Sequence, residues 1–218
     1  MNDLIKIEFY PPFEEKINII SHALGLFLSL MGCIALIIHA SLDGTVWHIV
    51  SFSIYGASLI VLYTASTCYH ACKEPVLRRK LNILDHTAIY ILIAGSYTPF
   101  TLVTLNGTIG WIIFGLTWGL ALIGIILKLF FTGKYELISV LAYVFMGWLI
   151  IFAIKPLMNN LPTMGLYWLV AGGIFYTLGA ILYAIEKLKF NHALFHLFVL
   201  MGSICQFITV YCYVLTFN

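Results

Sequence analysis

Charged residues are scarce in this sequence of 218 residues: Asp, Glu, Lys and Arg make up only 9% of it, whereas hydrophobic residues make up 62%. A soluble domain carries roughly 25% charged residues. So little charge excludes a water-soluble fold and predicts a protein whose solvent is lipid. The net charge of +2 is also too small to indicate a nucleic-acid partner.

The sequence also lacks the features of a secreted, disulfide-linked protein. Its five cysteines lie in or beside apolar segments, where we expect them to act as small hydrophobic side chains. A secretory signal begins with a basic region. The amino-terminal segment instead carries several acidic residues, so we do not expect it to act as a signal peptide.

Long uncharged stretches set the architecture. Backbone groups in lipid must be hydrogen-bonded internally, and continuous apolar runs favour helices over the alternating pattern of a membrane barrel. The stretch 86–127 is long enough for two spans, with Asn106-Gly107 as a turn signal at its middle. We therefore predict an all-α seven-transmembrane bundle that forms a single integral membrane domain over residues 1–218. The approximate spans are 17–39, 46–70, 83–104, 109–130, 136–154, 164–185 and 193–215, and the longest loop is 71–82.

Lysine and arginine residues set the expected orientation. In short loops they are enriched on the cytoplasmic side. Only Lys155 falls on the side opposite the amino terminus, and the other ten basic residues fall on the same side as that terminus: Lys6, Lys16, Lys73, Arg78, Arg79, Lys80, Lys128, Lys134, Lys187 and Lys189. We therefore expect the amino terminus in the cytoplasm and the carboxyl terminus outside, in a multi-pass protein of a bacterial plasma membrane.

Ionisable groups within the spans are the main functional signal, because such groups are costly in lipid and usually serve a function. Five of them lie close behind basic residues at the cytoplasmic ends of four spans. At 1.5 Å per residue they lie roughly 4–11 Å inside those basic anchors, so they can share one layer of the inner leaflet. They are His22, His70, Asp85, His192 and His196.

This layer has the composition of a metal site. His192 and His196 are spaced i and i+4, so both imidazoles face the same way. Together with His70 they form a set of three imidazoles, which suits Zn²⁺ and leaves a fourth position for water. Asp85 could ligate the ion directly, as in a structural site, or hold the zinc-bound water, as in a catalytic one.

Other histidines and cysteines receive simpler interpretations. His39 and His48, near the outer ends, are expected to pack between helices and form hydrogen bonds there, and so is His86, which lies about 100° around the helix from Asp85. An alternative metal site would use Cys68 and Cys72, which are also spaced i and i+4 but project from other faces than His70 between them.

At these residues the sequence resembles the hemolysin III family, the bacterial branch of the progestin and adipoQ receptor group that includes the adiponectin receptors. The likeness covers nearly the whole chain, in order. The matching pieces are Glu15-Lys16-Ile17-Asn18-Ile19-Ile20-Ser21-His22, Ser66-Thr67-Cys68-Tyr69-His70, Leu84-Asp85-His86, Gly95-Ser96-Tyr97-Thr98-Pro99-Phe100 and His192-Ala193-Leu194-Phe195-His196.

The resemblance implies a zinc site in which His70, His192 and His196 are the ligands. It implies that Asp85 is the partner of the zinc-bound water, and that Ser66, one helical turn before His70, is a second polar contact. Lipid amide hydrolysis, as in the wider ceramidase-like superfamily, is the activity implied, whereas the bacterial family name implies pore formation or cell lysis.

Three functions compete at this stage. The first is a zinc-dependent intramembrane hydrolase of a lipid amide or ester, in which Asp85 accepts the proton of the attacking water and Ser66 stabilises the developing oxyanion. The second is a membrane sensor or regulator in which zinc only joins helices, with lipid as a ligand. The third is a pore, against which the sequence shows no amphipathic lumen stripe.

Overall fold

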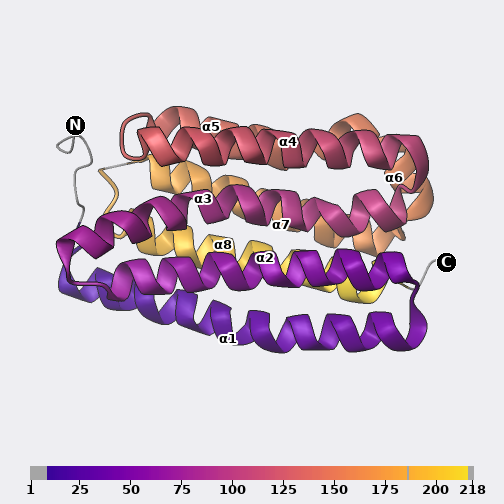
Figure 1. Ribbon diagram of the computed structural model, residues 1–218, viewed down its shortest axis with the longest axis horizontal. Coiled ribbons are helices and arrows are strands. Elements are labelled where there is room, and N and C mark those ends of the chain that lie inside the picture. Colours follow the sequence, from indigo (N-terminus) through magenta and orange to yellow (C-terminus); the bar gives the residue numbers. More distant parts are fainter. Residues whose placement is uncertain (1–8, 186, 216–218) are drawn as a thin grey trace.

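In the computed structural model, which describes residues 9–185 and 187–215, every regular element is a helix. Figure 1 shows long helices that run side by side along one axis. Within the described residues, seven helical segments are long and apolar enough to cross a membrane, which confirms the predicted number of spans. The protein is therefore an all-α, multi-pass membrane protein.

Four of the seven spans are single helices and three are composite. The third span joins an α-helix to a π-helix, as does the seventh, and the fifth contains a short 3₁₀ segment. The elements are α1 (Pro12–Asp43), α2 (Val46–Ala71), α3 (Pro75–Pro99), η1 (Phe100–Thr104), α4 (Gly107–Phe131), α5 (Glu136–Gly147), η2 (Leu149–Ala153), α6 (Ile154–Asn160), α7 (Thr163–Ala184), α8 (Asn191–Thr209) and η3 (Val210–Val214).

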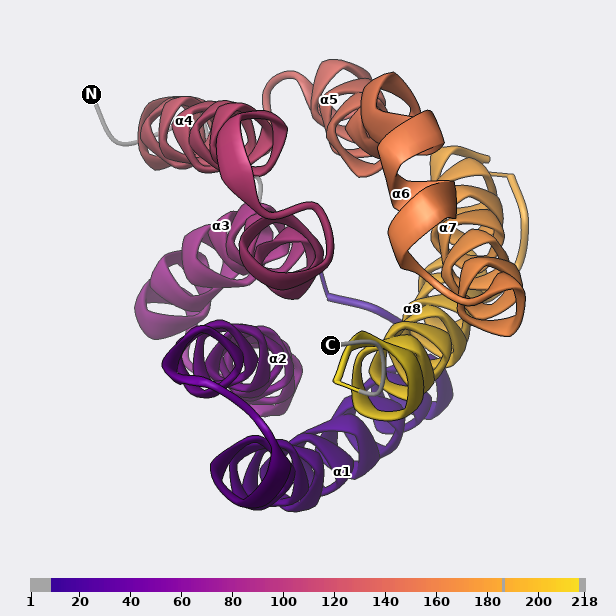
Figure 2. The same ribbon diagram turned by 90° about the vertical axis from the view of Figure 1, so that its right-hand side faces the viewer.

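The helices form a ring in sequence order. Seen along the bundle axis, α1 to α7 follow one another around the ring, and α8 lies between α7 and α1 (Figure 2). Each of the early helices packs on its neighbour, α1 on α2, α2 on α3 and α3 on α4. The return of α8 to α1 places the start of the seventh span beside the first two helices.

Burial differs strongly between the spans. In the apolar part of the α3 span 78% of residues are buried, against 56% for α2, 50% for the span of α8, and 17–28% for the other four. Lipid is as apolar as a leucine side chain, so the outer helices can leave large apolar residues facing outward. Phe130 and Phe152, which are 75% and 77% exposed, are examples. The interior is thus formed mainly by the three helices that carry His70, Asp85 and the His192/His196 pair.

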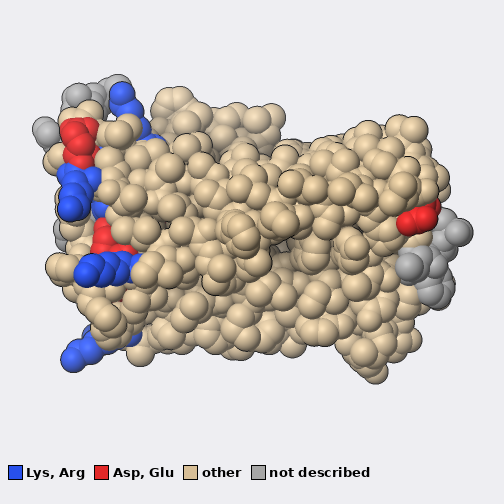
Figure 3. Space-filling model, turned by 90° about the horizontal axis from the view of Figure 1, so that it is seen from below, with Lys and Arg blue, Asp and Glu red and all other residues tan. Residues whose placement is uncertain are grey.

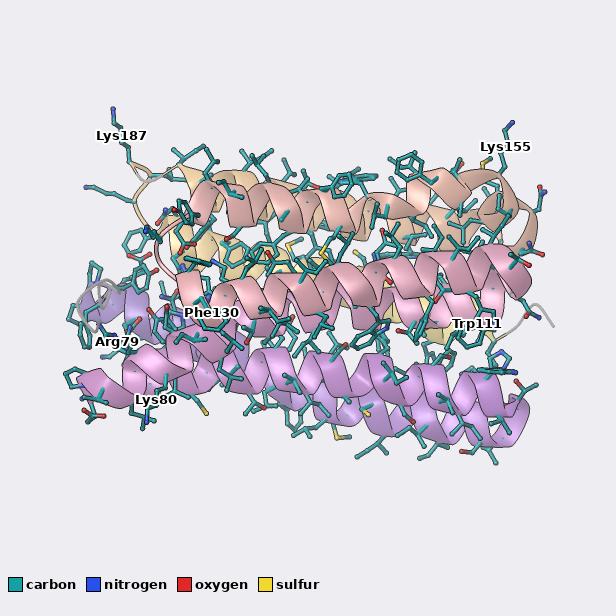
Figure 4. All side chains as sticks on the ribbon, turned by 45° about the horizontal axis from the view of Figure 1, so that its top comes forward. Arg79, Lys80, Trp111, Phe130, Lys155 and Lys187 are labelled. Atoms are coloured by element: carbon teal, nitrogen blue, oxygen red, sulfur yellow. The ribbon has the colours of Figure 1, made fainter. Side chains whose placement is uncertain are left out.

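Charged side chains gather at the two ends of the bundle and leave a broad uncharged band between them (Figure 3). Arg79, Lys80 and Lys187 lie at one end, whereas Lys155 and Trp111 lie at the other (Figure 4). Lys6, which contributes to the predicted charge bias, lies outside the described residues. By the positive-inside rule, the end that carries Arg79, Lys80 and Lys187 is the expected cytoplasmic end.

The predicted orientation can be tested by cysteine labelling at these two ends. In a variant whose native cysteines are replaced by alanine, Lys155→Cys should react with a membrane-impermeant maleimide added to intact cells. Lys187→Cys should react only after the cells are permeabilised, because Lys187 is exposed at the opposite end. The reverse labelling pattern would contradict a cytoplasmic amino terminus.

The third span begins earlier than the sequence analysis predicts. The loop expected at 71–82 is mostly helical, because α3 starts at Pro75 rather than near residue 83. The Glu74 carboxylate caps this start by accepting hydrogen bonds from the amides of Val76 at 2.9 Å and Leu77 at 2.6 Å. Proline at the first helical position fits such a start. The basic residues 78–80 therefore sit on the first turns of α3.

The fifth span contains a break that the sequence analysis does not predict. After Gly147 the backbone passes through η2 before α6 resumes the helix. The Tyr97 hydroxyl donates to the Gly147 carbonyl at 2.8 Å and accepts from the Ile150 amide at 3.0 Å. A side chain from α3 thus satisfies backbone groups that the break would leave unpaired in lipid.

Candidate metal centre

Three histidines converge near the charged end of the bundle. His70 lies in the last turn of α2, and His192 and His196 lie one turn apart at the start of α8. One nitrogen atom from each ring lies within 4.8 Å of the other two, and all three side chains are buried. The predicted ligand residues are therefore brought together, and this group could hold a metal ion.

Two rings of this three-histidine group, those of His70 and His192, turn their Nε2 atoms toward each other. His192 Nε2 and His70 Nε2 are 3.1 Å apart. On the other side of these two rings, Nδ1 is occupied: His70 Nδ1 lies 2.8 Å from a carboxylate oxygen of Glu15, and His192 Nδ1 lies 3.0 Å from the hydroxyl of Tyr10. Outer partners on Nδ1 are the usual companions of histidines that ligate metals through Nε2.

The spacing of the His70 and His192 nitrogens is compatible with a tetrahedral zinc ion. Two nitrogen ligands at about 2.0–2.1 Å from a tetrahedral ion lie roughly 3.3–3.4 Å apart, close to the 3.1 Å between the His70 and His192 Nε2 atoms. Since the Glu15 carboxylate can only accept a hydrogen bond, the proton of His70 resides on Nδ1 and a lone pair points inward from Nε2. That lone pair can accept the Nε2 proton of His192 or bind a cation in its place, so the His70 donor is compatible with a metal ion.

His22 joins the same layer from α1. Its ring stacks on His196 with centroids 3.5 Å apart and an interplanar angle of 11°, and its edge meets the ring of Tyr63. His22 is buried but does not belong to the three-histidine group. Its position next to His196 is consistent with the shared depth predicted for the polar layer, and it forms one wall of the site.

Asp85 and Ser66 lie beside the histidines rather than among them. Asp85 is buried on α3, and Ser66 is buried on α2 one turn before His70. Both line one cavity together with His192 and His196. The Asp85 carboxylate stands outside the group of mutually close nitrogens, so the described residues provide three potential ligands and a nearby carboxylate.

The cavity of about 190 Å³ runs from these polar groups into the middle of the bundle. Its lining is mostly apolar and comes mainly from α3, α5, α7 and α8, and it reaches Gln206. Gln206 follows His196 by ten residues, or about 15 Å along the helix. The site therefore opens onto a long apolar space, with its polar groups confined mainly to one end.

A second, more polar cavity of about 400 Å³ lies at the charged end. Tyr10 and Asn191 contribute to its wall, and Glu136, Val140 and Tyr183 line both cavities. Tyr10 also contacts His192, so this space lies next to the three-histidine group. The two cavities together place the site between an apolar and a polar compartment.

The other candidate residues have separate roles. His48 caps α2 through hydrogen bonds with Thr45, and His39 lies 3.8 Å from Asp43. His86 Nδ1 donates to the Asn82 carbonyl at 2.8 Å. These contacts are local to one helix; His39 and His86 also contact other helices, through the ring of Tyr211 and the carboxylate of Glu136. The alternative site at Cys68 and Cys72 finds no support, because neither belongs to a potential metal-binding group of described residues and Cys68 is exposed.

Sequence reasoning missed three residues around the site: Tyr10, Glu15 and Arg78. Arg78 is 1% exposed and forms a salt bridge with Glu15. Glu15 precedes His22 by seven residues, which puts both on one face of α1. That spacing is a signal that could have pointed to Glu15. The contacts of Tyr10 and Arg78 depend on tertiary packing and leave no comparable pattern.

Comparisons with known proteins identify the family of this chain. The profile of the haemolysin-III related family matches residues 11–207. The chain is 51% identical over 202 residues to Hemolysin-3 of Bacillus cereus, covering 93% of this chain and 92% of that protein. It is 45% identical to the Hemolysin-3 homolog of Bacillus subtilis strain 168, covering 92% and 94% of the two chains. The human monocyte to macrophage differentiation factor is 28% identical, covering 92% and 84%. The chain therefore belongs to the haemolysin-III related family.

Proposed function

We propose that this protein is a zinc-dependent intramembrane hydrolase that cleaves a lipid amide or ester in a bacterial plasma membrane. The observation that carries the proposal is the buried three-histidine group at the end of a long apolar cavity. Three imidazoles with a free fourth position are a typical catalytic zinc set, whereas a structural site is usually closed by a fourth protein ligand.

His70, His192 and His196 would hold the ion through their Nε2 or Nδ1 atoms. When bound, zinc lowers the pKa of a coordinated water to about 7 and polarises a carbonyl group. The inward Nε2 atoms of His70 and His192 favour Nε2 ligation for these two residues. The position of Asp85 outside the ligand group supports contact with the ion through water rather than direct ligation.

Asp85 would act as the general base and then as the general acid. Its carboxylate takes a proton from the water that attacks the carbonyl carbon, and returns it to the amine or alcohol released when the C–N or C–O bond breaks. Ser66 donates a hydrogen bond to the carbonyl oxygen as negative charge develops on it. Both residues line the cavity that also contains His192 and His196.

The cavity supports a lipid as the substrate. Its apolar lining would receive an alkyl chain from the bilayer, while the bond to be cleaved remains at the polar end beside Asp85. Because the chain would leave lipid rather than water, its burial would gain little hydrophobic free energy, and packing against the lining would contribute most of its binding. The mostly apolar lining would also limit the access of bulk water to the reacting groups.

Removal and return of zinc tests the proposal. Protein reconstituted in liposomes that contain amide-linked and ester-linked lipids should release fatty acid. We expect that treatment with a chelator abolishes this release, and that added zinc restores it. Full activity without metal would contradict the proposal. Zinc binding without lipid turnover would support a structural zinc in a sensor, and ion conductance without turnover would support a pore.

A further inference from the structure

The three-histidine group is held from outside by side chains that the proposed chemistry does not use. Glu15, at the start of α1, accepts the hydrogen bond of His70 Nδ1 at 2.8 Å. Tyr10, just before α1, contacts His192 Nδ1 at 3.0 Å and stacks on that ring with centroids 4.5 Å apart. The start of α1 and the segment just before it thus contact histidines on both α2 and α8.

Glu15 determines which nitrogen of His70 is available. A carboxylate ion offers only acceptors, so it binds the tautomer of His70 that carries its proton on Nδ1. The lone pair of that tautomer is on Nε2, which faces His192. A negative partner on Nδ1 also makes the imidazole a stronger electron donor to a cation.

Arg78 in turn fixes Glu15. Its Nη2 donates to the second carboxylate oxygen of Glu15, so each oxygen of this carboxylate has its own donor. The Nη1 atom of Arg78 donates to three carbonyls at the end of α2, those of Tyr69 at 3.1 Å, His70 at 3.3 Å and Cys72 at 2.9 Å.

The guanidinium of Arg78 is also held from its two faces. It lies 4.5 Å from the ring centroid of Phe9 and 4.5 Å from that of Tyr69. A planar fork with five donors can make all these contacts at once, and the ammonium of a lysine cannot. Arg78 therefore ties the start of α3 and the end of α2 to the carboxylate of Glu15.

We propose that Glu15 and Arg78 are positioning residues of the metal centre: Glu15 fixes the tautomer and orientation of His70, and Arg78 fixes Glu15. This inference rests on the metal role of the three-histidine group proposed above. It goes beyond the ligand set, because it makes zinc affinity depend on an ion pair that touches no part of the ion or the substrate.

The substitution Glu15→Gln separates this role from simple packing. The side chain keeps its size, but it has one acceptor oxygen where the carboxylate has two, so it cannot serve both His70 and Arg78. Glu15→Asp keeps both oxygens on a shorter side chain and provides a second variant if Glu15→Gln folds poorly. Asp43→Asn is the matched control, because Asp43 lies on the same helix and pairs with another histidine, His39, at 3.8 Å.

Zinc affinity is measured on the purified full-length proteins in detergent, by competition with a chromogenic chelator. We expect Glu15→Gln to lower the affinity about 10- to 100-fold, as is typical when an outer partner of a ligating histidine is lost. Glu15→Asp should give a smaller loss, and Asp43→Asn should match wild type. The visible absorption of bound Co²⁺ should change in Glu15→Gln but not in Asp43→Asn, since it reports the coordination geometry.

The outcomes distinguish the two proposals. The positioning role alone would be overturned if wild type, Glu15→Gln and Glu15→Asp had equal zinc affinity and equal Co²⁺ absorption. If the variants also unfolded at a lower temperature, the ion pair would contribute to stability only. Absence of zinc binding by wild type would overturn the metal centre, and the positioning role with it.

Discussion

The double substitution His192→Ala/His196→Ala should leave the purified protein without bound zinc, whereas wild type should carry about one ion per chain. The two residues supply two of the three ring nitrogens in the group, and both come from one face of α8. His70 alone would remain, and a single imidazole cannot hold the ion against water. Metal content by mass spectrometry after chelator-free purification is the measurement.

His39→Ala is the matched control for this experiment. His39 is also a histidine within a span, but it pairs with Asp43 and stands outside the three-histidine group. Its loss should leave the metal content unchanged. If the double variant still bound zinc, the ion would lie elsewhere in the protein. If wild type bound no metal, the hydrolase proposal would be contradicted and the buried histidines would serve in helix packing.

The features of the fold that are predictable from the sequence are those that burial in lipid requires. A chain with so little charge must place its charged residues at the ends of helices, so the number of spans could be counted from the uncharged stretches. The start of α3 does not follow from the uncharged stretches, because the Glu74-Pro75 start signal lies in a charged segment. The break after Gly147 was also missed, since Tyr97 on another helix satisfies its backbone.

The residues of the candidate site are predictable from the sequence where equal depth in the membrane is enough to bring them into contact. His70, His192 and His196 lie near helix ends that face the same side, and residues at equal depth in a narrow bundle come together. Depth does not give the angle around a helix axis. The stacking of His22 on His196 and the position of Asp85 outside the ligand group therefore required the structure. Tyr10 and Arg78 lie beyond the spans that the sequence analysis searched.

Replacement of Asp85 by asparagine should lower lipid turnover by at least about 100-fold, because general acid–base catalysis contributes roughly 10²- to 10⁴-fold. An amide of the same size fills the same place on α3 but cannot take a proton from water. Since Asp85 stands outside the three-histidine group, the variant should keep its zinc. Fatty acid release and metal content, measured on the same preparation, give the two quantities.

The pair of measurements separates three roles of Asp85. Loss of turnover with zinc retained assigns proton transfer to Asp85, and Ser66→Ala should then give a smaller loss, because Ser66 contributes one hydrogen bond to the oxyanion and no proton. Loss of both zinc and turnover would make Asp85 a fourth ligand, and a site closed by four protein ligands is typical of a structural ion. If Asp85→Asn turned over lipid as fast as wild type, Asp85 would not be catalytic. The described lining of the cavity would then offer only Glu136 as another carboxylate. Asp43→Asn, which changes a remote carboxylate, is the control.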